Sequence, residues 1–587
     1  MDEQQRRLAE EVLGEKKAAI GFAKRLFFGA FESRLAFPYP EVPLDQRQPL
    51  TNFLTQLNDF VEHSIDPVWI DQHAEIPETV IAGLGKLGVL GMTIPQEYGG
   101  LGMSQHAYCK AAEIVSRRCA STALFINAHQ SIGLKALVLF GTEEQRNKWL
   151  RPLATGQSIA AFSLTEPNAG SDAAGIETRA VYDPIKRVYR INGKKQWTTN
   201  GSIAHVLTVM AKTEMDTPKG KQDRITAFLV TPDMAGFKIS APALEKVGMR
   251  GTKTTNLEFN DMEVPEENIL GPKGGGLKVC LTVLDYGRTT FGAACTGAAK
   301  FLKEQAINHA CTRYQFQRPL ASFGLVKKKI ARMEALVYAM DASTYFTAGF
   351  IDVGYDDIMI ESAILKVFTS EALWSILYDT MQIYGGRSLF TDYPFERMMR
   401  DARLNMIGEG SNEVMRAFIG VAGMRDVGLD LQSLLQASRH PWKESSALLK
   451  LMGERVEQLR LPKITVASSL LKDEAHSLSK AIRKFGWAVT RLLARYRENI
   501  IENQLELERI AESAIAIYTS SAVLSKLDNT LSKKELSTSN QEIAAGKFYC
   551  RMAQDVIKAN LSSLFSPQDT EIESLSDQKT GLNKIGR

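Results

Sequence analysis

The chain has 587 residues, of which 44% are hydrophobic and 24% charged, as is ordinary for a soluble globular protein of three or four domains. Its formal net charge of +4 is too weak to indicate a nucleic-acid-binding protein. The six cysteines form no CxxC pair and the eight histidines are scattered, so we expect buried thiols in a reducing compartment and no metal site.

Residues 1–50 are expected to form an N-terminal extension, which ends in the proline-rich stretch "AFPYPEVPLDQ". Acidic side chains recur within the first fifteen residues, which suits neither a secretory signal nor an acid-poor mitochondrial transit peptide. We expect no apolar stretch that reaches the ~18 residues of a spanning helix. We therefore expect a cytoplasmic protein of bacterial type that at most lies on a membrane, or a mitochondrial one whose transit peptide has been removed.

Four domains are expected after this extension. Residues 51–160 show helical spacing of apolar residues, as in "SIGLKALVLFGTEEQRNKWL", whereas residues 161–272 contain short β-rich runs separated by turns, such as "RVYRINGKKQWTT". Helical spacing returns over residues 273–427 and again over residues 428–587. The expected fold class is α+β multidomain: an N-terminal α-helical domain, a middle β-domain, a C-terminal four-helix-bundle-type α domain and an additional C-terminal α-helical domain.

The chain lacks the usual nucleotide-binding loops. "GPKGGGLKV" fails the phosphate-loop pattern because neither Ser nor Thr follows Lys278, and no persuasive G-x-G-x-x-G motif follows a predicted strand. A nucleotide, if one is bound, must be held in another way.

Two segments of the β region, "AFSLTEPNAGSDAAGIETRA" and "KQWTTNG", resemble the flavin-contacting segments of the acyl-CoA dehydrogenase family. The resemblance continues in order through "PQEYGGLG", "KVGMRGTKTTNLEF", "ENILGPKGGGLKV", "CTRYQFQRPLASFGL", "QIYGGRSLFTDYPFERMMRDARL" and "GEGSNEVMR". It implies an FAD-dependent acyl-CoA dehydrogenase of fatty-acid β-oxidation, which converts an acyl-CoA thioester to the trans-2-enoyl-CoA.

The resemblance also implies which residues bind FAD. Backbone amides of Leu164 and Thr165 would bind the polar edge of the flavin, and the Trp197 ring would pack on its other side. Arg313 and Phe316 would reach the FAD of a neighbouring subunit, which implies a homodimer, and the planar guanidinium suits paired phosphate oxygens. The complete implied set is Phe162, Leu164, Thr165, Gly170, Ser171, Trp197, Thr199, Arg313, Phe316, Gln382, Gly385, Gly386, Ser411 and Glu413.

Glu409, in "IGEGSNEVMR", occupies the position of the family's catalytic base. By resemblance it takes the α-proton while hydride leaves the β-carbon, and its backbone N–H polarises the thioester carbonyl. Burial of the substrate should raise the pKa of this carboxyl. Some members carry the base directly before a substrate-side arginine, but here that position is Gly287. The implied substrate-binding residues are Ser171, Asp285, Arg288 and Gly410.

Two residues beside the base depart from the family pattern. Gly408 stands where an aromatic residue usually precedes the glutamate, and Ser411 replaces a threonine but keeps the hydroxyl. The missing ring leaves two alternatives open, a wider pocket or slower chemistry.

The region after residue 427, together with "FAKRLFFGAFESRLAFPYPEV", resembles the very-long-chain branch of the family and implies a long-chain acyl-CoA substrate. Asn127 stands where long-chain relatives tend to carry a small residue, and an amide that faces an acyl tail costs free energy unless it is hydrogen-bonded. Either this amide faces away, or the tail is shorter or differently shaped. Residues 480–497, "KAIRKFGWAVTRLLARYR", predict either a packing helix with a solvated basic face or a peripheral membrane contact.

The expected electron acceptor is an electron-transfer flavoprotein, as the family resemblance implies. Two alternatives remain: an acyl-CoA oxidase that reoxidises its flavin with oxygen, and a weakly active or inactive homologue that serves as an assembly scaffold.

Overall fold

The computed structural model describes residues 20–217, 220–355, 357–439, 460–533 and 539–580. These residues form two compact units. The larger unit contains residues 40–412, and the smaller combines residues 20–39 with the described chain after residue 412.

The larger unit begins with helices whose apolar faces share one core that includes Leu57, Leu84, Leu90 and Val115. Their ends follow local rules, since Ser104 caps α7 and Thr142 forms a capping box with Gln145 at the start of α10. The helices are α4 (Leu44–Ser64), α5 (Pro67–His73), α6 (Glu78–Lys86), α7 (Gln105–Arg118), α8 (Ala120–Ile126), α9 (Lys135–Phe140) and α10 (Glu143–Ala154), with the π-helical turn η3 (Asn127–Leu134) between α8 and α9.

The continuous helical stretch Ala120–Phe140 corrects one expectation from the sequence. By length and composition it could cross a membrane, although no stretch was expected to be long enough. Most of it is buried inside the structure, as is typical of a core helix in a soluble protein.

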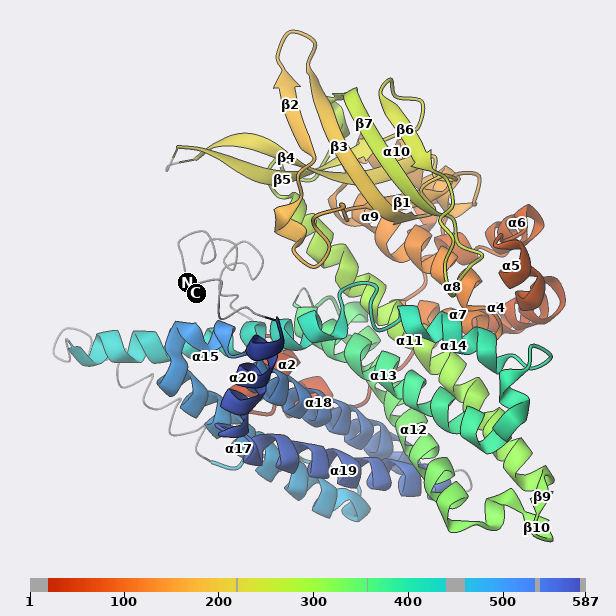
Figure 1. The fold of residues 1–587 in the computed structure, drawn as a ribbon, viewed down its shortest axis with the longest axis vertical. Coiled ribbons are helices and arrows are strands. Elements are labelled where there is room, and N and C mark those ends of the chain that lie inside the picture. The colour runs from red at the N-terminus through yellow and green to blue at the C-terminus, as the bar shows by residue number, and fades with distance from the viewer. Residues whose placement is uncertain (1–19, 218–219, 356, 440–459, 534–538, 581–587) are drawn as a thin grey trace. The chain divides into compact units, whose positions relative to one another are not determined.

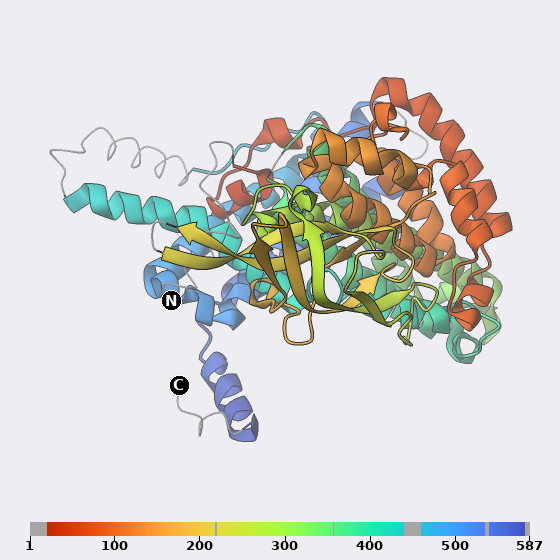
Figure 2. The same cartoon turned by 90° about the horizontal axis from the view of Figure 1, so that it is seen from above.

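A mostly antiparallel sheet follows in the order β6-β7-β3-β2-β4-β5-β8, with β1 parallel to β4. Alternate residues such as Ile191, Leu207 and Leu257 are buried, which explains the alternating sequence pattern. Figures 1 and 2 show the long β4–β5 hairpin projecting beyond the other strands. The strands are β1 (Ala160–Ser163), β2 (Arg179–Asp183), β3 (Val188–Thr199), β4 (Val206–Thr217), β5 (Gly220–Val230), β6 (Phe237–Ala241), β7 (Thr254–Pro265) and β8 (Ile269–Leu270).

The third part of the larger unit is a helical bundle around α11, which runs from beside the sheet to the β9–β10 hairpin (Figure 1). Close packing with α13 depends on Gly292, because a Cβ there would lie 2.8 Å from Cγ of Leu365. The elements are α11 (Gly276–Thr312), β9 (Tyr314–Gln315), β10 (Arg318–Pro319), α12 (Gly324–Asp352), α13 (Met359–Tyr384) and α14 (Phe395–Leu404).

The smaller unit is helical, and residues 20–39 pack within it. The ring of Phe27 lies 5.0 Å from that of Phe485, and Gly486 allows the backbone of Gly29 to approach closely. The helices are α2 (Phe22–Phe27), α3 (Ser33–Ala36), α15 (Asn412–Arg439, which starts at the boundary), α17 (Lys472–Tyr496), α18 (Gln504–Ser532), α19 (Ser539–Ser562) and α20 (Gln568–Thr580).

Helix α17 contains most of the basic stretch 480–497. Its apolar residues Ile482, Phe485 and Leu492 are buried within the smaller unit, which favours the packing-helix interpretation. Trp487 is 49% exposed and lies under the guanidinium of Arg483.

Candidate active site

Glu409 lies in the turn between α14 and α15, in a left-handed backbone conformation that is uncommon for a residue with a side chain (φ 57°). Neighbouring helices hold this turn by its carbonyl oxygens. Arg288 of α11 donates from Nε to the Glu409 carbonyl at 3.2 Å, and Lys366 of α13 donates from Nζ to the Gly410 carbonyl at 2.6 Å. Lys366 also donates to Oδ1 of Asn412 at 2.7 Å. The turn is therefore fixed by two buried cations.

The Glu409 carboxyl group faces η3 and α11. Its Oε1 accepts a hydrogen bond from Nδ2 of Asn127 at 2.9 Å, whereas its Oε2 is buried and makes no hydrogen bond within the protein. Gly287 leaves the room for this carboxyl, since a Cβ on residue 287 would lie 3.0 Å from Oε2. Burial raises the pKa of Glu409 to about 7, although Arg288, Lys366 and the Asn127 hydrogen bond each lower it. A carboxyl that titrates near neutral pH suits a general base.

Asp285 and Arg288, both expected to bind substrate, form a buried pair one turn apart on α11. Nη1 of Arg288 lies 3.1 Å from Oδ1 of Asp285, and the Ser362 hydroxyl donates to the same oxygen at 2.8 Å. Burial raises the pKa of Asp285 to about 6 despite the opposing effect of Arg288. The structure thus places Arg288 on the backbone of Glu409, and Asp285 holds Arg288 there.

A cavity of about 540 Å³ includes Asn127, the hydrogen-bond partner of Glu409, in its wall. Small and apolar side chains from α7, α8, α11 and α13 form a large part of its lining, which also contains charged residues from α5, α7 and α14. The small and apolar lining includes Ala111, Ala112, Val115, Ala294, Ala298, Leu373 and Leu377.

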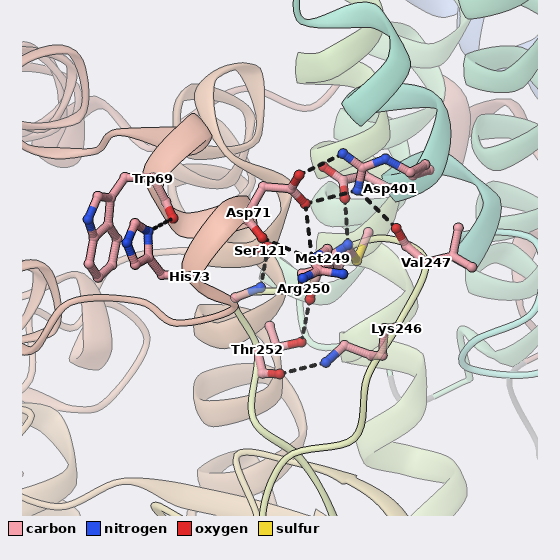
Figure 3. A network of polar contacts seen from close by, with 12 residues as sticks. Trp69, Asp71, His73, Ser121, Lys246, Val247, Met249, Arg250, Thr252 and Asp401 are labelled. Carbon is pink, nitrogen blue, oxygen red and sulfur yellow. Dashed lines mark hydrogen bonds and ion pairs between the residues drawn. The ribbon is translucent and has the colours of Figure 1, made fainter. Parts of the chain in front are cut away.

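Part of the cavity wall is held by a polar network around the loop between β6 and β7 (Figure 3). Within this network, the guanidinium of Arg400 binds both carboxylate oxygens of Asp71, at 3.0 and 2.6 Å, and the Val247 carbonyl at 2.9 Å. The backbone N–H of Met249 donates to Oδ1 of Asp401 at 2.5 Å. Because Asp71, Met249 and Asp401 also line the cavity, this network fixes its shape.

The two predicted flavin segments lie side by side in the β-domain. The backbone N–H of Gln196 donates to the Thr165 carbonyl at 2.9 Å, and Nζ of Lys195 donates to the Leu164 carbonyl at 2.9 Å. Lys195 also forms a buried ion pair with Glu166 at 2.7 Å. This pair ties the loop to the strand without using any of the predicted flavin contacts.

Trp197 lies at an irregularity of β3, where the strand register shifts between Lys195 and Thr198. Its φ is 59° and its side chain is 60% exposed. An exposed tryptophan fits a flat aromatic cofactor, and the backbone of Gly170 is open, since a Cβ there would meet nothing within 4 Å. Ser171 is exposed and Thr199 half-buried, whereas the Phe162 side chain is buried in the core, which leaves its backbone for a contact.

The remaining predicted FAD residues lie elsewhere. Arg313 and Phe316 are exposed at the β9–β10 hairpin, and the end of α13 reaches the same region because His309 stacks on Tyr384 at 4.1 Å. Arg313 lies roughly 37 Å from Arg288 along α11, at a rise of 1.5 Å per residue.

Two further groups complete the predicted FAD residues. The end of α13 exposes Gln382, Gly385 and Gly386. Ser411 lies in the Glu409 turn, and Glu413 is exposed in the first turn of α15. The predicted FAD residues therefore form separate groups within one chain.

Sequence reasoning missed Lys366 and the role of Asn127. A lone lysine within the apolar run "AILKVF" of a helix was the available signal for the first. Asn127 was noticed as an unusual polar residue, but its partner lies 282 positions away. Among the described residues, no group of three or more His, Cys, Asp or Glu side chains could hold a metal ion.

Comparison with known proteins matches the chain to three acyl-CoA dehydrogenase family models: the N-terminal domain over residues 50–157, the middle domain over 161–262 and the C-terminal domain over 274–424. The ACAD9/ACADV C-terminal domain matches residues 469–580. The chain belongs to the acyl-CoA dehydrogenase family. As an acyl-CoA dehydrogenase it has the predicted fold class and is an FAD oxidoreductase, so both expectations are confirmed.

Similar acyl-CoA dehydrogenases span nearly the whole chain. The very long-chain specific acyl-CoA dehydrogenase of Bos taurus mitochondria is 35% identical, covering 96% of this chain and 88% of its own. The probable acyl-CoA dehydrogenase FadE10 of Mycobacterium tuberculosis is 31% identical over 97% of this chain and 90% of its own. The structure of an acyl-CoA dehydrogenase complexed with FAD from Bacillus anthracis aligns with a TM-score of 0.78 at 29% identity, covering 96% of this chain and 95% of that one.

Proposed function

We propose that this acyl-CoA dehydrogenase oxidises long-chain acyl-CoA thioesters and that Glu409 is its catalytic base. The observation that carries the proposal is the Glu409 carboxyl itself: Asn127, a residue of the cavity wall, holds one of its oxygens, and the other makes no hydrogen bond within the protein. Oε2 is therefore the atom available to take the α-proton. A pKa raised to about 7 by burial allows Glu409 to accept a proton and release it again near neutral pH.

The surrounding residues orient this base. Arg288 and Lys366 bind the carbonyl oxygens of Glu409 and Gly410, which fixes the direction of the turn and leaves the Glu409 N–H to polarise the thioester carbonyl. A donor that is fixed before the reaction needs no reorganisation as negative charge develops on the oxygen. Bound FAD supplies the acceptor for the hydride from the β-carbon.

The FAD site is proposed to combine the backbone of Leu164 and Thr165 with the exposed ring of Trp197. The second group, Arg313 and Phe316 with the end of α13, lies roughly 37 Å along α11 from Arg288, which holds the turn of the proposed base. This separation supports a homodimer in which each FAD contacts both subunits. Sedimentation and flavin content of the wild-type protein and of Arg313→Ala test this proposal. The wild-type protein should sediment as a dimer that carries flavin, and the variant dimer should contain less flavin.

A long acyl chain fits the part of the cavity that small and apolar side chains line. The volume of about 540 Å³ lies within the usual range of ligand pockets, and alanines of α7 and α11 keep the space between these helices open. The names of the relatives also point to very-long-chain substrates.

Anaerobic reduction of the flavin by saturated acyl-CoAs of increasing length tests the substrate. Long chains should reduce it fastest, and Ala298→Leu should slow reduction by long chains about tenfold while leaving butyryl-CoA unaffected, because only a long tail reaches that part of the wall. An equal loss of reduction rate with the long-chain acyl-CoA and with butyryl-CoA would contradict the assignment of this cavity to the acyl tail.

Contact of the smaller unit with a membrane through α17 is a further proposal, supported by the exposed Trp487 beside Arg483.

An electron-transfer flavoprotein is the proposed electron acceptor. Slow reoxidation of the reduced, product-bound enzyme in air and fast reoxidation by an electron-transfer flavoprotein would support a dehydrogenase. Fast reoxidation in air would instead indicate an oxidase, and a flavin that no acyl-CoA reduces would favour the scaffold alternative.

A further inference from the structure

We propose that Asn127 is a positioning residue for Glu409, holding the carboxyl group in the orientation in which Oε2 meets the α-proton. The inference rests on the proposed role of Glu409 as base. It gives a role to a buried amide in the cavity wall, which would be costly without a hydrogen-bond partner.

The position of Asn127 in the helix brings its amide to the base. It is the first residue of the π-helical turn η3, whose wider winding is a frequent feature of functional sites. The side chain is 4% exposed, and Nδ2 donates to Oε1 of Glu409 at 2.9 Å. A hydrogen bond to a charged carboxylate is stronger than one between neutral groups, so it restrains the carboxyl rotamer effectively.

The other groups around Glu409 do not replace this contact. Arg288 and Lys366 donate to backbone carbonyl oxygens of the turn, and Arg288 is also paired with Asp285. Tyr108 of α7 and Cys295 of α11 are the further titratable groups that face Glu409, and burial raises the pKa of each, so both stay neutral near pH 7. The hydrogen bond from Asn127 is therefore the restraint on the carboxyl group itself.

Residue 408 offers no brace on the other side. Gly408 has no side chain, and a Cβ there would make only ordinary contacts with Leu404, the nearest at 3.6 Å. Residue 408 therefore contributes no side-chain contact to the carboxyl group, which receives its hydrogen bond from Asn127.

The test replaces Asn127 by Ala and by Asp, because Asp keeps the shape of the side chain but removes the donor. Both variants should raise the pH midpoint of flavin reduction by about 1 unit, Asp more than Ala, because the charged form of Glu409 loses its hydrogen bond. Near pH 6 the reduction rate should then fall about tenfold. Asn405→Ala is the matched control, since it removes another buried asparagine of the same cavity wall; whatever its rate, its midpoint should stay at the wild-type value.

A second readout does not depend on turnover. Infrared difference spectra of the protein without substrate report the titration of the Glu409 carboxyl, with Glu409→Gln assigning the band. The midpoint should rise in Asn127→Ala and Asn127→Asp even if no acyl-CoA reduces the flavin, so failure of the proposed function and failure of this inference are distinguishable. An unchanged midpoint in both variants, with wild-type melting temperature, would overturn the positioning role.

Discussion

Gly287 and Glu409 lie against each other so closely that a Cβ on residue 287 would sit 3.0 Å from Oε2 and 3.3 Å from Oε1 of the carboxyl group. The same Cβ would lie 2.8 Å from Cγ2 of Ile132, so this Cβ could not avoid the carboxyl group by moving toward Ile132. The glycine that precedes Arg288 is therefore needed for the base to occupy its place.

Gly287→Ala should move the carboxyl group and slow the chemical step. A displacement of about 1 Å at a reacting group can reduce the rate about 100-fold, so we expect a fall of 10- to 100-fold in the rate of flavin reduction. Stopped-flow measurement with one long-chain acyl-CoA checks this, together with the flavin content of the variant. Gly292→Ala, at another glycine of α11, is the control for simple helix crowding, because its Cβ would meet Leu365 of α13 instead of the base.

Glu409 should also make the stability of the protein depend on pH. Its pKa is about 7 in the folded protein against an ordinary value of 4.5, so the native state binds more protons between these values and the free energy of unfolding falls as pH rises through this window. The shift corresponds to about 3 kcal/mol in the free energy of unfolding. This contribution is present below pH 4.5 and is lost as the pH rises through about 7.

Glu409→Gln should remove this dependence. The variant should melt at a higher temperature than wild type near pH 8, and the difference should shrink toward pH 4.5, because a neutral amide is not penalised by burial as a carboxylate is. Thermal melting across this range checks the prediction, with the exposed Glu75→Gln as a control that should follow wild type. A wild-type melting temperature that rises steadily between about pH 5 and pH 7, with no gain in the variant, would contradict it.

Lys366→Met should loosen the turn that carries the base. The carbonyl oxygen of Gly410 and Oδ1 of Asn412 would each lose a donor, at 2.6 and 2.7 Å in the structure, and a buried acceptor left without a partner costs about 1–3 kcal/mol. We expect a lower melting temperature and flavin reduction slowed at least tenfold. Loss of the cation also removes an influence that lowers the pKa of Glu409, so the pH midpoint should rise.

Lys366→Arg keeps the positive charge and separates these effects. Its pH midpoint should stay closer to wild type than that of Lys366→Met, even if the larger head group disturbs the turn. Identical midpoints in the two variants would show that the charge of Lys366 does not act on Glu409.

Lys195→Met should weaken flavin binding without touching a predicted flavin contact. The variant leaves Glu166 as a buried carboxylate without its cation, which costs about 3–5 kcal/mol in such pairs, and it frees the Leu164 carbonyl. The flavin-to-protein ratio and the melting temperature should both fall. Adding Glu166→Gln to Lys195→Met should recover part of the stability, and a double variant no more stable than the single one would argue against the pair.

The sequence predicted the kinds of domain correctly because each rests on a local period. Alternation in "RVYRINGKKQWTT" corresponds to β3, and helical spacing in "SIGLKALVLFGTEEQRNKWL" corresponds to η3, α9 and α10. Packing partners are not encoded locally, so the burial of residues 20–39 within the smaller unit was not anticipated from the proline-rich end of this segment.

The position of Glu409 came from the family resemblance, but its environment did not. The left-handed turns at Glu409 and Trp197 have no clear sequence signal, because residues with side chains rarely adopt them and tertiary contacts hold them there. For Asn127 the sequence left open whether the amide faces away or the substrate tail differs, and the structure shows a third arrangement, in which the amide binds the base.

The most direct test of the account is anaerobic flavin reduction by a long-chain acyl-CoA in wild type and in Glu409→Gln, measured at the same flavin content. We expect rapid loss of the oxidised flavin absorbance in wild type and a rate lower by about 100- to 10,000-fold in the variant, as follows from loss of a general base. Equal rates in the two proteins would show that another group takes the α-proton and would contradict the assignment of Glu409.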